Sequence, residues 1–252
     1  MGSKTKIDWC DSSWNPVTGC NHDCRYCYAR RIAQRFGAHF TYFPRRIHIR
    51  ETPMKLNDRV QPYPYDFEPT LHRYKLDEPK RWKKHKKIFV CSMADLFGDW
   101  VPDEWIMEVM DSCNSAPWHD YLFLTKNPKR YIDLAHKGIL PVGNKAFWFG
   151  TSVTHADDPF FFHEYCNTFV SIEPILEPFG AFGNRNALSL PNWIIIGAET
   201  GNRKGKVIPE KAWIDELVSQ ADEFDIPVFM KESLRNLMGA DFRQEFPWEA
   251  KV

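Results

Sequence analysis

The chain contains a C-x3-C-x2-C motif, formed by Cys20, Cys24 and Cys27. Its residue types and spacing could carry chemistry. Three thiolates are the ligand set of a four-iron, four-sulfur cluster in which one iron stays open to a substrate or cofactor. The alternative is a zinc site, which normally takes four Cys or His ligands, with Cys10 or His22 as the fourth. The complete spacing, with an aromatic residue directly before the last cysteine, favours iron.

The residues after the third cysteine have the pattern of a helix. Ala29, Ile32, Ala33 and Phe36 fall on one face at helical spacing, and Gly37 follows as the expected cap. We therefore predict a helix that begins directly after the cysteine loop. The free N–H groups and the dipole at its N-terminus would stabilise the negative charge that thiolate ligands accumulate.

The cysteine content also indicates a cellular compartment. The chain has 7 cysteines, an odd number, and its N-terminus lacks the apolar stretch of a secretory signal. We predict a reducing, cytoplasmic location, where clustered thiols bind metals more often than they form disulfides. Cys91 and Cys113 lie on apolar faces of predicted elements, which indicates that they serve packing.

The composition is that of an ordinary globular protein. Of the 252 residues, 43% are apolar and 26% charged, and 33 Lys and Arg balance 33 Asp and Glu. This balance excludes a nucleic-acid tail or an acidic solvating segment as a description of the whole chain. No apolar run approaches the roughly 18 residues that a membrane span needs. Because no boundary or repeat stands out, we predict a single domain over residues 1–252.

Short apolar runs that end in polar residues recur along the chain, and they are the main indication of its architecture. Continuous apolar runs of this kind are typical of strands buried on both faces, as in parallel sheets. The runs are Lys87–Cys91, Tyr121–Leu124, Phe147–Gly150, Phe169–Val170, Trp193–Gly197 and Pro227–Met230.

Helical patterns lie between these runs. They cover residues 105–113, 128–136 and 213–221, and Gly138 follows the second as a cap. The alternation predicts an α/β fold with a parallel sheet, and the length is close to the roughly 250 residues of a closed (β/α) barrel. We predict a single (β/α) barrel, partial or full, with an open doubly wound sheet as the alternative. In either fold, the polar residues after the strands meet at one rim, where sites are built.

Two segments stand outside this alternation. Residues 44–79 are rich in Pro, Tyr and charge, and we predict a long irregular excursion there. Residues 80–87 then carry six formal positive charges around Trp82. We favour a solvated approach to the next strand, and the alternative is a patch that contacts phosphates and stacks on a base.

The cysteine motif resembles the signature of the radical S-adenosylmethionine superfamily. A wider match covers nearly the whole chain and resembles a phage- and prokaryote-associated radical-SAM-like family of unknown function. The segments that carry the wider match are Trp14–Cys20, Cys91–Phe97, Leu124–Lys126, Ser171–Pro174 and Gly197–Gly201.

The resemblance implies a partial or full (β/α) barrel and a radical enzyme. Cys20, Cys24 and Cys27 would each bind one iron of a [4Fe–4S] cluster, and S-adenosylmethionine would chelate the fourth iron. One electron from an external reductant would cleave the sulfonium, giving methionine and a 5′-deoxyadenosyl radical that abstracts hydrogen from an unknown substrate. By the same analogy, the contacts to S-adenosylmethionine would come from Tyr26, Ser92, Asp95, Thr125, Lys126, Ser152 and Glu173.

Polar residues after the later strands are candidates for catalysis and substrate contact. We name Glu199 and Lys231 for catalysis, with Arg203 and Glu232 as further contacts. A competing hypothesis is a binding module in which Cys10 completes a zinc site or closed cluster and the basic segment contacts nucleic acid. A third is a degenerate barrel that keeps the cluster as scaffold. Arginines in and after the cysteine loop make nucleic acid one candidate substrate for the enzyme as well.

Overall fold

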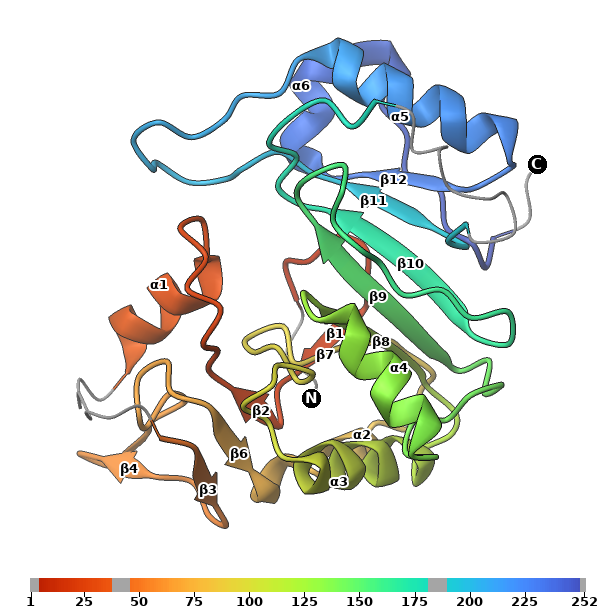
Figure 1. Cartoon of the computed structure of the whole chain (residues 1–252). Coiled ribbons are helices and arrows are strands. Elements are labelled where there is room, and N and C mark those ends of the chain that lie inside the picture. Colours follow the sequence, from red (N-terminus) through yellow and green to blue (C-terminus); the bar gives the residue numbers. More distant parts are fainter. Residues whose placement is uncertain (1–4, 38–45, 181–189, 250–252) are drawn as a thin grey trace. The chain divides into compact units, whose positions relative to one another are not determined.

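The computed structural model describes residues 5–37, 46–180 and 190–249, and the chain divides into two compact units, residues 1–141 and 142–252 (Figure 1). Each unit is described by itself. Two such units are compatible with two halves of one barrel or with two domains, so the single-domain organisation stays a prediction.

Within the described part of the first unit, three parallel strands form the central sheet. Trp14 pairs with Val90, and Ile88 pairs with Tyr121, so the carboxyl ends of all three strands lie at the same edge. Sequence patterns predict the second and third strands and both helices correctly, but they miss the first strand because it has only three residues. The elements are β1 (Ser12–Trp14), β7 (Lys87–Val90), β8 (Asp120–Thr125), α3 (Asp103–Asn114) and α4 (Pro128–His136).

The excursion predicted to be irregular contains short strands. One of them, β6, pairs with β2 on one side and with β3 on the other, in a three-stranded sheet. Strands of two or three residues leave too little alternation for a sequence pattern to show. The elements are β2 (Val17–Thr18), β3 (His48–Arg50), β4 (Lys55–Leu56), β5 (Arg59–Val60), β6 (Thr70–His72), η1 (Arg73–Lys75) and α2 (Glu78–Arg81).

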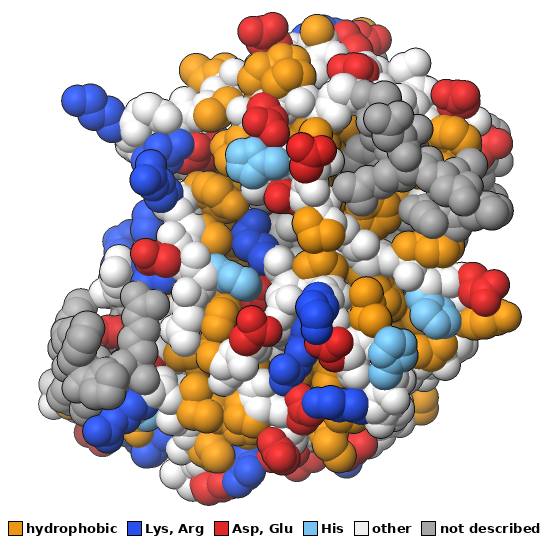
Figure 2. Space-filling model, viewed as in Figure 1, with side chains coloured by type: hydrophobic (Ala, Val, Ile, Leu, Met, Phe, Trp, Pro, Cys, Tyr) orange, Lys and Arg blue, Asp and Glu red, His pale blue; other side chains and the backbone are white. Residues whose placement is uncertain are grey.

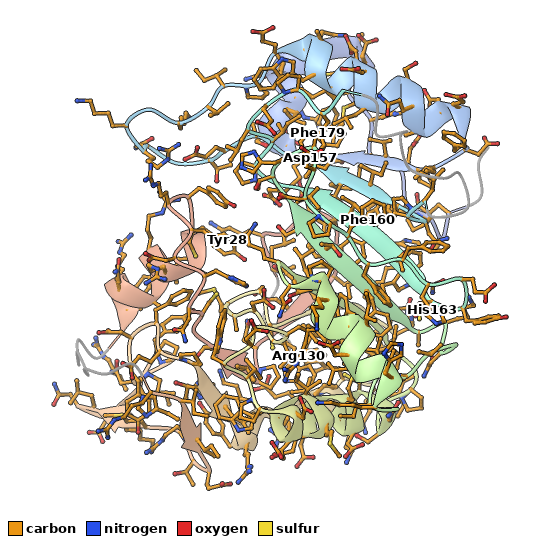
Figure 3. The ribbon with its side chains drawn as sticks, viewed as in Figure 1. Tyr28, Arg130, Asp157, Phe160, His163 and Phe179 are labelled. Carbon is orange, nitrogen blue, oxygen red and sulfur yellow. The ribbon has the colours of Figure 1, made fainter. Side chains whose placement is uncertain are left out.

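The helix predicted after the cysteines is present as α1 (Tyr28–Phe36), and Tyr28 lies in its first turn (Figures 1 and 3). Ala29 and Ala33 are its buried residues. Gly37 ends the helix, but in an extended conformation with φ −81° rather than the left-handed one that a glycine cap predicts. Glycine is needed there because a Cβ atom would collide with the Asp66 side chain and the Ala33 carbonyl.

The surface of α4 carries charges of both signs in matched pairs. Lys129 forms an ion pair with Asp133 at an N···O distance of 2.6 Å. Asp103 forms ion pairs with Arg130 at 2.5 Å and with Lys137 at 2.6 Å. Acidic and basic side chains accordingly alternate over this helix (Figure 2). These contacts fix α4 against the start of α3, and they leave little net charge on that surface.

The described residues of the second unit form four parallel strands and one long helix. Each neighbouring pair is in parallel register, for example Ile172 with Ile196 and Ile196 with Met230. All four strands and the helix are predicted from the sequence. The elements are β9 (Phe147–Val153), β10 (Asn167–Ile172), β11 (Ile194–Ile196), α5 (Lys211–Glu223), β12 (Val228–Met230), η3 (Glu232–Leu234), α6 (Arg235–Met238) and η4 (Gly239–Asp241).

The two faces of this sheet carry different side chains. Ile172, Ile196 and Met230 share a buried apolar cluster with Ile214 and Leu217 of α5. Because side chains alternate along a strand, the next residues, Glu173, Gly197 and Lys231, project to the other face. The polar ends of β10 to β12 therefore lie on the face turned away from α5.

In the part of the chain that the structure describes, no helix is long and apolar enough to cross a membrane.

A buried histidine links stability to pH in the first unit. His72 is fully buried on β6, and its Nε2 lies 2.9 Å from the Thr18 hydroxyl on β2, two residues before Cys20. Burial and, to a smaller extent, the cations Lys75 and Arg50 lower the pKa of His72 to about 3. The folded protein therefore keeps this ring neutral, whereas the unfolded chain protonates it below about pH 6.5.

We predict that lowering the pH from about 7 to 5 reduces the free energy of unfolding by about 2 kcal/mol through His72 alone. The contribution is complete above about pH 6.5 and is lost as the pH falls towards 3, because only the unfolded state binds the proton. Denaturant unfolding of the wild-type protein and of His72→Asn at both pH values isolates the effect. Equal losses in the two proteins would contradict the assignment.

Candidate functional site

The cysteine loop is fastened by backbone hydrogen bonds where it leaves β2. Gly19 N donates to Met93 O at 2.9 Å, and Cys20 N donates to Phe67 O at 3.1 Å. Gly19 has φ +88°, and a Cβ atom there would collide with the backbone of Glu68. Only glycine fits such a position, so the start of the motif is set by the backbone on both sides.

Backbone N–H groups point at two of the three thiols. The Cys20 Sγ accepts from His22 N at 3.5 Å, and the Cys27 Sγ caps α1 by accepting from Arg30 N at 3.3 Å. Burial, with smaller contributions from Asp95 and from the neighbouring thiols of Cys24 and Cys27, raises the pKa of the Cys20 thiol to about 12. Burial also raises the pKa of Cys24, which Lys126 opposes. The three thiols thus lie close enough to repel one another as thiolates.

This donor set fits the cluster that the motif implies. Partly buried thiols that resist ionisation need a strongly positive partner to become thiolates, and cluster iron supplies that charge. In a cubane, each thiolate binds a different iron, so the thiols must be neighbours without meeting at one point. Within residues 5–37, 46–180 and 190–249, no group of three Cys, His, Asp or Glu side chains is set to hold a single metal ion. Cys10 Sγ lies 4.0 Å from Ile7 O, and its role as a fourth ligand stays a prediction.

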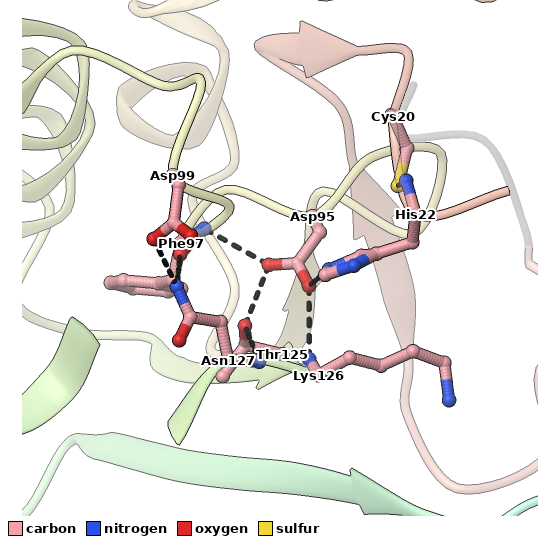
Figure 4. Close-up of polar contacts among 8 residues, drawn as sticks. All are labelled: Cys20, His22, Asp95, Phe97, Asp99, Thr125, Lys126 and Asn127. Carbon is pink, nitrogen blue, oxygen red and sulfur yellow. Dashed lines mark hydrogen bonds and ion pairs between the residues drawn. The ribbon is translucent and has the colours of Figure 1, made fainter. Parts of the chain in front are cut away.

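A buried carboxylate joins the cysteine loop to the ends of two strands (Figure 4). Asp95 Oδ1 accepts from Phe97 N at 3.0 Å and from the Thr125 hydroxyl at 2.7 Å. Its Oδ2 accepts from Lys126 N at 2.9 Å and lies 2.7 Å from His22 Nε2. Asp95 thus connects the turn after β7, the end of β8 and the loop between Cys20 and Cys24.

Further predicted contacts lie beside this loop. The Lys126 ammonium stands 5.4 Å from the centre of the Tyr26 ring and near the Cys24 thiol. The Ser92 hydroxyl donates to Asn15 Oδ1 at 3.1 Å, and Ser92 O accepts from the Tyr28 hydroxyl at 2.6 Å. Tyr26 and Lys126 are thus brought together with the cysteines, whereas the Ser92 hydroxyl is engaged in tying β1 to the turn after β7.

The second unit brings two predicted residues into an ion pair. Lys231 Nζ lies 2.6 Å from Glu173 Oε1, across the end of β11. Gly197 sits between them, and a Cβ atom there would lie 3.0 Å from Lys231 Cδ and 3.3 Å from Glu173 Cγ. The absence of a side chain at Gly197 therefore lets the two charges meet over the strand end.

The remaining predicted residues of this unit make other contacts. Glu199 is buried, and its carboxylate accepts two hydrogen bonds from the Arg203 guanidinium, at 2.6 and 2.7 Å. These hydrogen bonds lower the pKa of the Glu199 carboxyl. Glu232 pairs with Arg235 at 2.5 Å on the surface. Ser152 lies beside Ser171 in the β9–β10 register.

Sequence patterns miss the contacts of three residues that the structure places at these sites. Asn15 accepts from both the Ser92 hydroxyl and Met93 N, so it holds the turn after β7. The His22 imidazole contacts Asp95, and its position between two cysteines does not indicate this contact. The Ser171 hydroxyl is buried and has no hydrogen-bond partner among the described residues. The position of Ser171 could be predicted from the sequence, because it lies two residues before Glu173 and so projects from the same face of the sheet.

Comparison with known proteins gives a family over most of the chain. Residues 4–237 match the family described as "Protein of unknown function (DUF5131)". The chain belongs to the DUF5131 family. No curated protein sequence matches it significantly.

Two solved structures resemble the fold of this DUF5131 member. Spore photoproduct lyase complexed with dinucleoside spore photoproduct has a TM-score of 0.50 at 9% identity, over 92% of this chain and 79% of that one. A single-substitution mutant of the same lyase has a TM-score of 0.50 at 9% identity, over 91% and 78%. The likeness confirms the predicted fold class, an α/β fold with parallel strands of the partial (β/α)-barrel type.

We predict that Asp95→Asn destabilises the protein and loosens the cysteine loop. The amide keeps one acceptor and places an N–H₂ group against donors, so the free energy of unfolding should fall by about 2 kcal/mol. Denaturant unfolding measures this loss, and iron retained after gel filtration should fall with it because the contact to His22 is weakened.

Asp99→Asn is the matched control, because Asp99 is exposed and accepts one hydrogen bond from Asn127 Nδ2 at 2.7 Å. Its effect on unfolding should stay within about 0.5 kcal/mol. If the two variants behave alike, Asp95 does not hold the loop.

Proposed function

We propose that this protein is a radical S-adenosylmethionine enzyme whose [4Fe–4S] cluster is held by Cys20, Cys24 and Cys27. The observation that carries the proposal is the loop geometry: three neighbouring, partly buried thiols, two of them accepting backbone N–H bonds, directly before a helix. The fold shared with spore photoproduct lyase supports it. The lyase structure holds a dinucleoside, so a fold of this type accommodates a nucleic-acid-derived ligand.

The cluster and S-adenosylmethionine would supply reductive cleavage of the sulfonium C–S bond, giving methionine and a 5′-deoxyadenosyl radical that takes a hydrogen atom from the substrate. The electron would come from an external one-electron reductant. All 7 cysteines are free thiols, which agrees with the reducing, cytoplasmic location that we propose.

The chain's own residues have roles that follow from their positions. Lys126, beside Cys24 and Tyr26, would bind the carboxylate of S-adenosylmethionine as a point charge. Tyr26 would offer a face to the adenine. Asp95 and Thr125 would act chiefly by holding this loop, because each already makes hydrogen bonds within the protein.

Residues of the second unit complete the proposal. Glu173 and Lys231 would exchange their mutual ion pair for polar groups of S-adenosylmethionine or substrate, and Ser152 with Ser171 would add hydroxyl contacts on the same sheet face. Glu199 and Arg203 already satisfy each other through two hydrogen bonds. We therefore assign Glu199 to orienting Arg203 toward substrate.

The first test is iron binding after anaerobic reconstitution. The wild-type chain should hold about four irons, and Cys20→Ala, Cys24→Ala and Cys27→Ala should each abolish stable binding. Cys10→Ala is the matched control and should retain the cluster. Iron, sulfide and zinc analysis of the four variants measures this. Stoichiometric zinc, or loss of the cluster in Cys10→Ala, would favour a closed four-ligand site instead.

The second test is the release of 5′-deoxyadenosine from the reduced, loaded protein. Lys126→Ala and Glu173→Ala should need a higher S-adenosylmethionine concentration for the same rate, since losing a charge-assisted contact costs roughly 1.5 to 3 kcal/mol. That cost corresponds to roughly 10- to 150-fold in concentration. Lys129→Ala, which removes a surface ammonium paired with Asp133, should leave the dependence unchanged. Release of no 5′-deoxyadenosine by the fully loaded wild type would contradict the proposal.

A further inference from the structure

The helix that follows the cysteine loop turns an apolar row outward. Tyr28, Ile32 and Phe36 lie four residues apart on α1, and their exposed fractions are 44%, 37% and 52%. The face that packs inward carries only the small residues Ala29 and Ala33. Exposed large side chains in a row are unusual on a helix that has its own buried face, and they indicate a binding surface.

A row of arginines runs next to this apolar row. Arg31 and Arg35 each precede a residue of the row by one position, and Arg25 lies just before the helix; all three are exposed. The helix contains no acidic residue. Among the described residues, no ion pair involves these three arginines, whereas Arg30 meets Asp23 at 3.3 Å. The cations of α4 differ, because Lys129 and Arg130 are each paired with an acid.

The aromatic rings of the row are held in place. The Tyr28 hydroxyl donates to Ser92 O at 2.6 Å, which fixes that ring beside the turn after β7 (Figure 3). The guanidinium of Arg35 lies 5.3 Å from the centre of the Phe36 ring. Residues four apart on a helix rise by about 6 Å, so two parallel rows result, one of guanidinium groups and one of apolar rings.

From this juxtaposition, we propose that the outward face of α1 binds single-stranded nucleic acid. Arginines would contact the phosphates, and bases would stack on Tyr28 and Phe36, the combination by which proteins hold single strands without reading sequence. A balanced total charge is no obstacle, because the positive charge on this helix is local. With 9 residues, α1 is short for an interfacial membrane helix, and its rings alternate with charges that suit a polyanion.

This inference rests on the proposed function, because it names the substrate class of the proposed enzyme. Tyr28 follows Cys27 directly in the chain, so a strand bound along α1 would lie beside the cluster loop. A nucleotide at that end of the strand would be the group presented for hydrogen abstraction. The substrate would therefore be a nucleic acid with an unpaired segment.

The test is anaerobic fluorescence anisotropy with the cluster-loaded protein and labelled single-stranded DNA and RNA of about 16 nucleotides. We expect binding that weakens with salt, with a log-log slope of about −2 for three phosphates neutralised in a single strand. Arg31→Glu with Arg35→Glu should weaken binding at least about tenfold and flatten the slope. Phe36→Ala should weaken it by about fivefold or more and leave the slope unchanged, because stacking releases no counterions.

Lys83→Glu with Lys84→Glu is the matched control. It makes the same change of charge in another exposed basic segment, which precedes β7 and so lies at the amino end of the strands. Since charges separated by more than about 10 Å are screened at 0.1 M salt, binding should stay within about twofold. Iron content and thermal melting confirm that each variant is folded, and Arg31→Gln with Arg35→Gln replaces the Glu variant if that one loses iron.

The outcomes separate this inference from the proposed function. Equal loss in the Arg and Lys variants, or equally tight binding of polyglutamate or of anionic phosphatidylserine vesicles, would overturn the inference. Lack of affinity for either oligonucleotide at low salt, in a protein that holds four irons and releases 5′-deoxyadenosine, would overturn the inference alone. Binding that depends on Arg31 and Arg35 in a chain that cannot hold iron would contradict the proposed function, and would leave α1 a nucleic-acid surface.

Discussion

The buried carboxylate of Asp95 is the contact on which the arrangement of the first unit depends. It accepts from two backbone N–H groups and one hydroxyl and meets one imidazole, and these groups come from three separate stretches of chain. A buried carboxylate is stable only when such partners satisfy it, so its presence commits all three stretches to one geometry. The cysteine loop takes its place from this commitment, since His22 lies between two of the cysteines.

The same constraint explains why the thiols suit a cluster. The loop is fixed at Gly19, at His22 and at the cap of α1, so the thiols stay close together even though burial disfavours the charged forms of Cys20 and Cys24. Electrostatic repulsion among three thiolates then has to be offset by bound metal charge. The second unit arranges charge differently, with Glu173 and Lys231 neutralising each other over Gly197. An ion pair of this kind offers one positive and one negative side chain to a zwitterionic ligand such as an amino acid.

The fold could be predicted well wherever a sequence pattern repeats. Strands β7 to β12 and helices α1, α3, α4 and α5 follow from apolar runs and helical spacing, because each buries a continuous face. The strands β2, β3 and β6 are too short to show alternation, so the sheet that leads into the cysteine motif could not be predicted. The cysteine motif can be recognised from the sequence because its spacing is local.

Side-chain contacts could be predicted less well than elements. Asp95, Thr125 and Lys126 lie at strand ends, as the patterns indicate, but whether a strand-end carboxylate faces a ligand or its own neighbours depends on the turn that follows. In this protein, the turn after β7 directs Asp95 towards His22 and the end of β8. Glu199 likewise meets Arg203 four residues later, a partner that helical or loop spacing alone cannot assign.

We propose that the three-cysteine cluster keeps one iron open for S-adenosylmethionine. Electron nuclear double resonance of the reduced cluster, with S-adenosylmethionine labelled at its amino nitrogen and carboxylate oxygen, tests this proposal. We expect the ligand to change the paramagnetic spectrum of the cluster, and we expect both labelled atoms to show coupling to the cluster. An intact cluster whose spectrum is unchanged by the ligand, with no coupling to either atom, would contradict the claim and indicate a closed site.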